Sequence, residues 1–173
     1  MSKARKTKKR LTRILPIPKT YLEAIIEGTP AFSPLFQFEN ALRIVLERHM
    51  KTCYGPDWWE VKVKSDLPRT YGYAENVMQK AQLMPWIGAT SRISASPLHA
   101  ITLGQLEEII IHYKADCIPS IFHGLDFFTG HMDVIKRVRN LFSHMHPCID
   151  KEDIKVLRRE IATLCDDLRS KLQ

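Results

Sequence analysis

The chain is poor in features that mark several large classes of protein. No apolar run approaches the roughly 20 residues of a membrane-spanning helix. No apolar stretch follows the basic N-terminus, as one would in a secretory signal. A glycine-rich phosphate-binding loop, a convincing set of alternating strands and an internal repeat are missing as well. We therefore expect a cytoplasmic protein that has no membrane segment.

Cysteine is also scarce, and its spacing is uninformative. The sequence contains four cysteines, which are Cys53, Cys117, Cys148 and Cys165. They form no Cys-x-x-Cys pair, which disfavours a zinc ribbon and a disulfide framework, so we predict reduced thiols and neither a bound metal nor a cofactor. One alternative is a zinc site at His144, His146 and Cys148, because sulfur and imidazole suit zinc, although no fourth ligand is evident nearby.

Charge is concentrated at one end of the chain. The formal net charge is +7, and residues 1–13 hold seven basic residues and no acidic one, so the rest balances at 19 basic and 19 acidic residues. The basic residues of this segment are Lys3, Arg5, Lys6, Lys8, Lys9, Arg10 and Arg13. We interpret residues 1–18 as a basic flexible tail and residues 19–173 as one helical domain, which suits a 173-residue chain that is 45% hydrophobic.

Three interpretations of this basic tail are open. A solvated terminus without a specific partner is the simplest. A tail that attracts nucleic acid through its phosphates, without reading sequence, is the functional one, and its basic residues are then candidates for RNA binding. A nuclear-import address is the third, and it applies only if the organism has a nucleus.

Helical periodicity recurs along the chain, so we predict an all-α fold, a helical bundle with an irregular central insertion. The predicted helices cover residues 20–28, 34–53, 75–83, 102–114, 131–146 and 150–172. Residues 61–72 and 85–97 are predicted as irregular connections, and residues 116–130 as a loop or a broken helix. Thr102 with Gln105 forms a capping box at the start of the fourth helix.

The helix over 34–53 has the clearest early pattern. Its apolar positions follow the 3.6-residue period, and they are Leu35, Phe38, Leu42, Val45, Leu46, His49 and Cys53. Charged pairs four apart, such as Glu39 and Arg43, support an exposed opposite side. Tyr54-Gly55-Pro56 breaks the helix, and for Trp58 and Trp59 we favour core packing over a base-stacking platform.

The helix over 131–146 carries the residues with the most chemical information. At about 100° per residue, its apolar residues fall within a stripe roughly 120° wide, which we predict to be buried. The stripe contains Val134, Ile135, Val138, Leu141, Phe142 and Met145. The opposite, polar face contains Lys136, Arg137, Arg139, Asn140, Ser143 and His144.

Arg139 and His144 together have the chemistry of RNA cleavage. An arginine can hold a phosphate bidentately and stabilise its growing charge. A histidine can take the proton of a 2′-hydroxyl group or give one to the leaving 5′-oxygen. Asn140 can hydrogen-bond the phosphate or orient the histidine. The simpler alternative is a solvated helix face whose terminal histidine is favoured by the helix dipole.

Ideal helical geometry keeps Arg139 and His144 apart. With Val138 as the zero of angle, they lie near about +100° and about −120°, and about 7.5 Å apart along the axis. Two arrangements bring them together. Pro147 clashes with the carbonyl of Ser143, so the helix should end near His144 and free its ring to swing. Alternatively, two such helices meet across a two-fold axis, and each site takes residues from both chains.

The segment Arg139-Asn140-Leu141-Phe142-Ser143-His144 resembles the signature of the HEPN superfamily, an arginine, usually followed by a polar residue, and then a histidine. Its place on the penultimate helix, before one long closing helix, fits the same family. Phe38-Glu39-Asn40-Ala41-Leu42-Arg43 resembles the first core helix of these domains. The break at Tyr54-Gly55-Pro56-Asp57-Trp58-Trp59 and the helix with Leu106-Glu107-Glu108-Ile109-Ile110 resemble the larger HEPN domains of RNA-processing and phage-defence proteins.

HEPN domains are typically helical bundles that dimerise through the motif helix. Many are metal-independent endoribonucleases of toxin–antitoxin, abortive-infection or RNA-processing systems. The resemblance therefore implies an endoribonuclease that leaves 2′,3′-cyclic phosphate and 5′-hydroxyl ends. Arg139, Asn140 and His144 would be catalytic, and Lys136 and Arg137 would contact RNA.

The resemblance also implies a homodimer formed through the motif helix, and it allows for an antitoxin or another protein partner. Other HEPN domains have lost activity and bind nucleotides, RNA or proteins. A non-catalytic module for RNA binding or dimerisation is therefore the alternative function.

Overall fold

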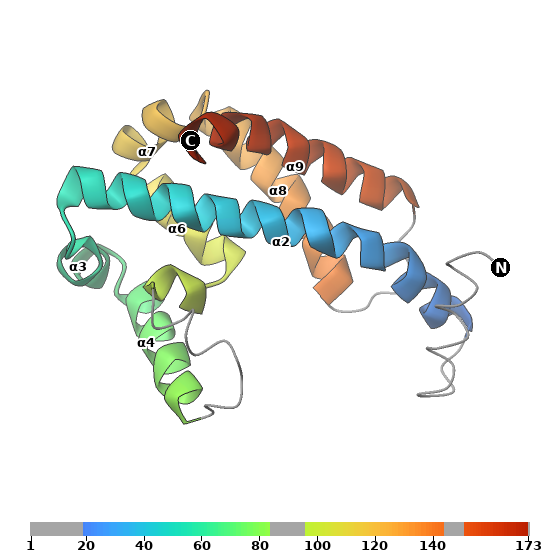
Figure 1. Cartoon of the computed structure of the whole chain (residues 1–173), viewed down its shortest axis with the longest axis horizontal. Coiled ribbons are helices and arrows are strands. Elements are labelled where there is room, and N and C mark those ends of the chain that lie inside the picture. Colours follow the sequence, from blue (N-terminus) through green and yellow to red (C-terminus); the bar gives the residue numbers. More distant parts are fainter. Residues whose placement is uncertain (1–18, 84–95, 144–150, 173) are drawn as a thin grey trace. The chain divides into compact units, whose positions relative to one another are not determined.

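The computed structural model describes residues 19–83, 96–143 and 151–172, and every regular element in these residues is a helix (Figure 1). The α-helices are α2 (Lys19–Tyr54), α3 (Lys64–Asp66), α4 (Pro68–Gln82), α6 (Leu103–His112), α7 (Lys114–Ile121), α8 (Leu125–Ser143) and α9 (Lys151–Leu172). A π-helix, η1 (Trp59–Val63), and a 3₁₀-helix, η2 (Pro97–Ala100), complete the set. The all-α prediction is confirmed for this part of the chain, in which no helix is both long and apolar enough to cross a membrane.

The described residues form two compact units, each built from segments that are distant in sequence. The first unit combines the described part of Met1–Phe38 with that of Thr129–Cys165. The second combines the described parts of Glu39–Phe128 and Asp166–Gln173. The helices α2, α8 and α9 therefore contribute to both units, and the predicted tail over residues 1–18 lies outside the described residues.

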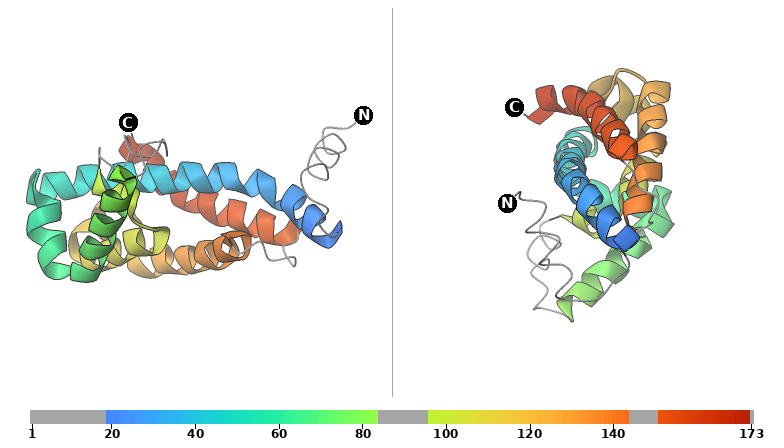
Figure 2. Two further views of the ribbon diagram at one scale, coloured as in Figure 1. Left: turned by 90° about the horizontal axis from the view of Figure 1, so that it is seen from below. Right: turned by 90° about the vertical axis from the view of Figure 1, so that its right-hand side faces the viewer.

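The helix α2 is continuous over 36 residues, whereas the sequence predicted two separate helices (Figure 2). Gly28 does not end it, and Pro30 and Pro34 lie inside it. A proline amide cannot donate a hydrogen bond, so the helix continues without the bonds that these two amides would have made. The buried apolar face further along outweighs these local stop signals, because tertiary packing supplies most helical stability in proteins.

The apolar face of α2 follows the predicted period along most of the described helix. Its buried positions are Leu35, Phe38, Leu42, Val45, Leu46 and Met50. His49 is half-buried and Cys53 is exposed, so the predicted face is wrong at its last two positions. The break after Tyr54 is confirmed, because Gly55 has a φ of 84° and its amide donates to the carbonyl of Lys51 at 2.9 Å.

Trp58 and Trp59 are both buried, which confirms core packing and leaves no open ring face for base stacking. Their rings meet edge to face with centroids 5.5 Å apart, and Trp59 also packs against Tyr71. The prediction of irregular structure over 61–72 is wrong, because η1, α3 and the start of α4 occupy it. Both α3 and α4 contact η1, the π-helix that begins at Trp59.

The remaining boundaries of the second unit are partly as predicted. The capping box of α6 is confirmed, since Thr102 Oγ1 accepts the Gln105 amide at 3.3 Å and Gln105 Oε1 accepts the Thr102 amide at 2.9 Å. Over 116–130 the predicted broken helix is confirmed in place of a loop, because most of α7 and the start of α8 lie there and residues 122–124 separate them. Most of the predicted 85–97 connection lies outside the described residues.

The buried face of α9 is confirmed through most of the helix. Its buried positions are Ile154, Leu157, Ile161, Leu164 and Leu168. Leu172 is 38% exposed, so the predicted face ends before it. Asp153 lies in the first turn as expected, where an acidic side chain suits the helix dipole, whereas the predicted cap Asp150 lies outside the described residues.

Candidate functional site

The helix α8 carries the motif residues, and its two faces differ in burial. Met132, Ile135 and Val138 are buried. Val134 and Leu141 are only half-buried, so the edges of the predicted stripe are less enclosed than expected. The Phe142 side chain and the whole of Met145 lie outside the described part of the chain. The buried residues fix which side of α8 remains accessible.

Arg139 and Asn140 lie side by side on the accessible part of α8. Nη1 of Arg139 donates a hydrogen bond to Oδ1 of Asn140 over 3.4 Å. Arg139 is half-buried and Asn140 is exposed. A guanidinium group has five donors in a planar fork, so one bond to Asn140 is compatible with bidentate binding of an anion. The asparagine carbonyl can therefore orient the fork.

The two other basic residues of this helix differ in their surroundings. Nζ of Lys136 lies 3.1 Å from Oδ1 of Asp133, which offsets part of its charge. Arg137 is exposed. Arg137 is therefore the better placed of the two predicted RNA contacts to attract a phosphate backbone.

Several predicted site residues lie outside the described residues. They are His144, the seven basic tail residues, and His146 and Cys148 of the alternative zinc site. The convergence of Arg139 with His144 stays a prediction, and so do the swing of the ring before Pro147 and the two-fold arrangement. Within residues 19–83, 96–143 and 151–172, no three side chains of His, Cys, Asp or Glu are grouped closely enough to hold a metal ion.

A histidine–carboxylate pair ties α8 to α9 within the first unit, and sequence reasoning missed it. Nδ1 of His131 lies 2.5 Å from Oε2 of Glu160, and the other carboxylate oxygen accepts Nε–H of Arg159 at 2.9 Å. Burial favours a higher pKa for Glu160, but hydrogen bonds and charges from His131 and Arg159 outweigh it and hold the pKa below its usual value. The partners His131 and Glu160 are 29 residues apart, so no local pattern signals the pair.

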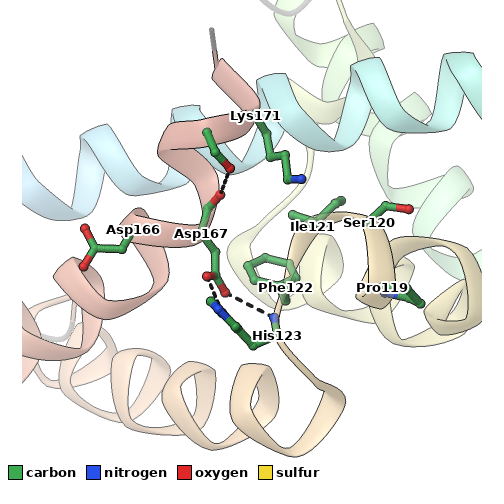
Figure 3. A pocket seen from close by; sticks show the side chains of 9 residues that line it. Pro119, Ser120, Ile121, Phe122, His123, Asp166, Asp167 and Lys171 are labelled. Atoms are coloured by element: carbon green, nitrogen blue, oxygen red, sulfur yellow. Dashed lines mark hydrogen bonds and ion pairs between the residues drawn. The ribbon is translucent and has the colours of Figure 1, made fainter.

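A second such pair, also missed, lines a cleft of about 440 Å³ in the second unit (Figure 3). The cleft lies between the end of α7 and the last turns of α9. Nδ1 of His123 lies 2.5 Å from Oδ1 of Asp167, and the backbone amide of His123 donates to Oδ2 over 3.3 Å. Lys171 lines the same cleft. The partners are 44 residues apart, which again removes any local signal.

Comparison of the chain with models of protein families, with curated proteins and with solved structures gives no match. The resemblance to HEPN domains therefore depends on the motif at 139–144 and on the order of the helices around it. Arg139 and Asn140 are the motif residues whose side chains are described.

Proposed function

We propose that this protein is a HEPN-type endoribonuclease that cleaves RNA without a metal ion, with Arg139, Asn140 and His144 as its catalytic residues. The observation that carries the proposal is the hydrogen bond from Arg139 to Asn140 on the accessible part of α8. The buried residues Ile135 and Val138 hold the other side of this helix in place. A cationic fork oriented next to a second polar side chain is a suitable receptor for one phosphodiester group.

In the proposed reaction, the imidazole of His144 takes the proton of an RNA 2′-hydroxyl group. The 2′-oxygen then attacks the adjacent phosphorus, the bond from phosphorus to the 5′-oxygen breaks, and the leaving 5′-oxygen takes a proton from water. The products are a 2′,3′-cyclic phosphate and a 5′-hydroxyl group. Arg139 stabilises the negative charge that grows on the non-bridging oxygens, which is where a fixed cation accelerates the step most.

In this proposal Asn140 both orients Arg139 and binds the phosphate. Its carbonyl oxygen accepts from Arg139, and its amide nitrogen is then the atom that can donate to the phosphate or to the histidine. Truncation of Asn140 should weaken the orientation of Arg139 without removing the cation. The expected effect is smaller than that of losing Arg139 or His144.

The site is proposed to be completed across a homodimer formed through α8. Arg139 and His144 point to different sides of one ideal helix, and a two-fold axis beside the motif lets each chain supply what the other lacks. Arg137 and the basic tail are proposed to attract the RNA backbone. A toxin, defence or RNA-processing role, with an antitoxin or another protein as partner, belongs to the same proposal.

The decisive test is cleavage of total RNA by the purified full chain in EDTA. The wild type should cleave, and both His144→Ala and Arg139→Lys should lose at least about a hundredfold in rate, as removal of a proton-transfer group or a bidentate clamp does in other enzymes. His112→Ala and Arg69→Lys are matched controls, because both residues are exposed and lie outside the motif, and they should cleave like the wild type.

Two results would refute the proposed activity. One is an unchanged rate in His144→Ala, and the other is loss of wild-type cleavage on chelation. Salt-dependent RNA binding without any cleavage would instead support the non-catalytic alternative, for which the salt dependence should fall when the basic tail is removed.

A further inference from the structure

The pair formed by His123 and Asp167 leaves one nitrogen of the histidine ring facing outward. Asp167 is buried, with its side chain 4% exposed. One of its oxygens accepts a hydrogen bond from the His123 backbone amide, and the other pairs with Nδ1 of the His123 ring. A carboxylate only accepts hydrogen bonds, so the proton of the neutral ring is on Nδ1. Nε2 then points away from Asp167, and because the His123 side chain is 78% exposed, it reaches the solvent beside the cleft.

Lys171 supplies a positive charge at the same cleft. Figure 3 shows its side chain extending over the cleft toward Ile121 of α7. The second acid of the cleft, Asp166, is turned away in this view and pairs with Nη1 of Arg169 at 3.1 Å. Each acid of the cleft therefore has a basic partner, whereas Lys171 forms no ion pair within the described residues. When the His123 ring carries a second proton, the basic groups at the cleft outnumber its two acids by one.

We propose that this cleft is a binding site for a phosphate group, held by Nε2–H of the doubly protonated His123 ring and by the ammonium group of Lys171. A second proton makes the ring a cation. The buried carboxylate of Asp167 balances that charge, and a buried carboxylate itself requires a partner of opposite charge. Phosphate oxygens accept several charge-assisted hydrogen bonds at once, so two cationic donors at one cleft suit this ligand.

The cleft has room for more than a bare phosphate ion. Its volume of about 440 Å³ lies within the range of roughly 300–1,000 Å³ that is typical of small-ligand sites. Ile121 and Phe122 give it an apolar lining next to the charged groups. The ligand is therefore a phosphate attached to an organic group, either a terminal phosphate monoester or a phosphodiester of an RNA backbone. This site does not depend on the proposed cleavage activity, and a protein that cuts no RNA can still bind phosphate here.

The test is a titration of the full chain, followed by NMR of the His123 ring and of the backbone amides around the cleft, near pH 6, where histidines commonly gain a proton. The probes are inorganic phosphate, a short oligoribonucleotide with a 5′-phosphate, and the same oligoribonucleotide with a 5′-hydroxyl. Saturable shifts at His123 and Lys171 are expected with phosphate. Equal binding of both oligoribonucleotides assigns the backbone diester, and preference for the phosphorylated one assigns the terminal monoester.

Variants separate binding from folding. Lys171→Gln removes the positive charge and replaces neither member of the pair of His123 with Asp167, and it should weaken phosphate binding about tenfold, the value of one charge-assisted hydrogen bond. His123→Gln keeps an amide donor for Asp167 and should weaken binding to a similar extent. Lys155→Gln is the control, because Lys155 is exposed on the same helix and pairs with Glu152 at 2.5 Å. The proposal is overturned if phosphate causes no saturable shifts in the wild type, or if Lys171→Gln, with an unchanged circular dichroism spectrum, binds as tightly as the wild type.

Discussion

His131 of α8 and Glu160 of α9 form a hydrogen-bonded pair, with Nδ1 and Oε2 2.5 Å apart, and the carboxylate side chain is only 8% exposed. Arg159 adds a second pairing to the same carboxylate, with Nη2 2.7 Å from Oε1. His131 and Glu160 both lie in the first unit, which also holds Arg139. The pair therefore fixes α8 against α9 on the helix that presents the candidate catalytic arginine.

Replacement of Glu160 by glutamine should lower the free energy of unfolding at neutral pH by about 2–3 kcal/mol, because a buried charge network loses its central member. The pKa of Glu160 is held below its usual value, so its contribution is complete above the ordinary glutamate pKa of about 4.3 and is lost as the pH falls below it. The difference between wild type and variant should therefore shrink in acid. Urea unfolding at pH 7 and near pH 3 measures it.

Glu152→Gln is the control for this prediction, because Glu152 lies on the same helix with its side chain 72% exposed and pairs with Lys155. An exposed ion pair contributes at most about 1 kcal/mol, so this variant should unfold nearly like the wild type. If Glu160→Gln and the wild type lose stability in parallel between neutral and acid pH, the ion pair does not stabilise the unit.

Arg43 of α2 is expected to stabilise the second unit by holding η2 and the residue that follows it. Nε of Arg43 donates to the carbonyl of Leu98 at 3.0 Å, and Nη2 donates to the carbonyl of Ile101 at 3.1 Å. Nη1 donates to Oε2 of Glu39 at 3.3 Å. Arg43→Lys should cost about 2 kcal/mol, because one ammonium group cannot reach three acceptors that a planar fork spans.

Chemical denaturation of Arg43→Lys beside Arg48→Lys checks this expectation. Arg48 is exposed on the same helix, and its substitution should change stability by no more than about 0.5 kcal/mol. Equal midpoints for the two variants would contradict the role of Arg43.

The contrast between α6 and Arg43 explains how much the sequence could predict. The capping box of α6 joins Thr102 to a residue three positions away, and the sequence contains everything that it needs. Arg43 was assigned to an exposed side because it is charged and lies four positions from Glu39, yet it is only 9% exposed. The carbonyls that make its burial tolerable lie 55 and 58 residues further along the chain.

The candidate site was likewise predictable only in part. Periodicity alone placed Arg139 and Asn140 away from the buried stripe of α8, because a helix repeats every few residues. It could not find the pairs of His131 with Glu160 or His123 with Asp167, since each joins elements that meet only in the folded chain. The continuity of α2 through its prolines could not be predicted either. The local stop signals favoured two separate helices, and only the folded chain shows that the helix continues.

The cysteines should differ sharply in reactivity. Burial raises the pKa of the Cys117 thiol to about 12, because the thiolate would be deprived of water, and the nearby Asp116 adds to this. At pH 8 the Cys117 thiol is then almost entirely protonated, whereas Cys53 is exposed to the reagent. Iodoacetamide should modify Cys53 in the native chain and Cys117 only after denaturation, as read by peptide mass spectrometry. Rapid native labelling of Cys117, at the rate of Cys53, would show that its surroundings are open.

The proposed composite site makes a quantitative prediction about mixtures of inactive chains. If Arg139 of one chain works with His144 of its partner, an Arg139→Ala chain paired with a His144→Ala chain has one site without either residue and one site with both. After subunit exchange in an equal mixture, half of the dimers are mixed, so about a quarter of the wild-type sites are restored. RNA cleavage should return to about that fraction. As a control, Arg139→Ala mixed with the double variant should stay inactive, because no pairing in that mixture restores a site. If the two single variants exchange subunits and remain inactive together, both residues act within one chain, and the swing of His144 at the end of its helix becomes the arrangement to test.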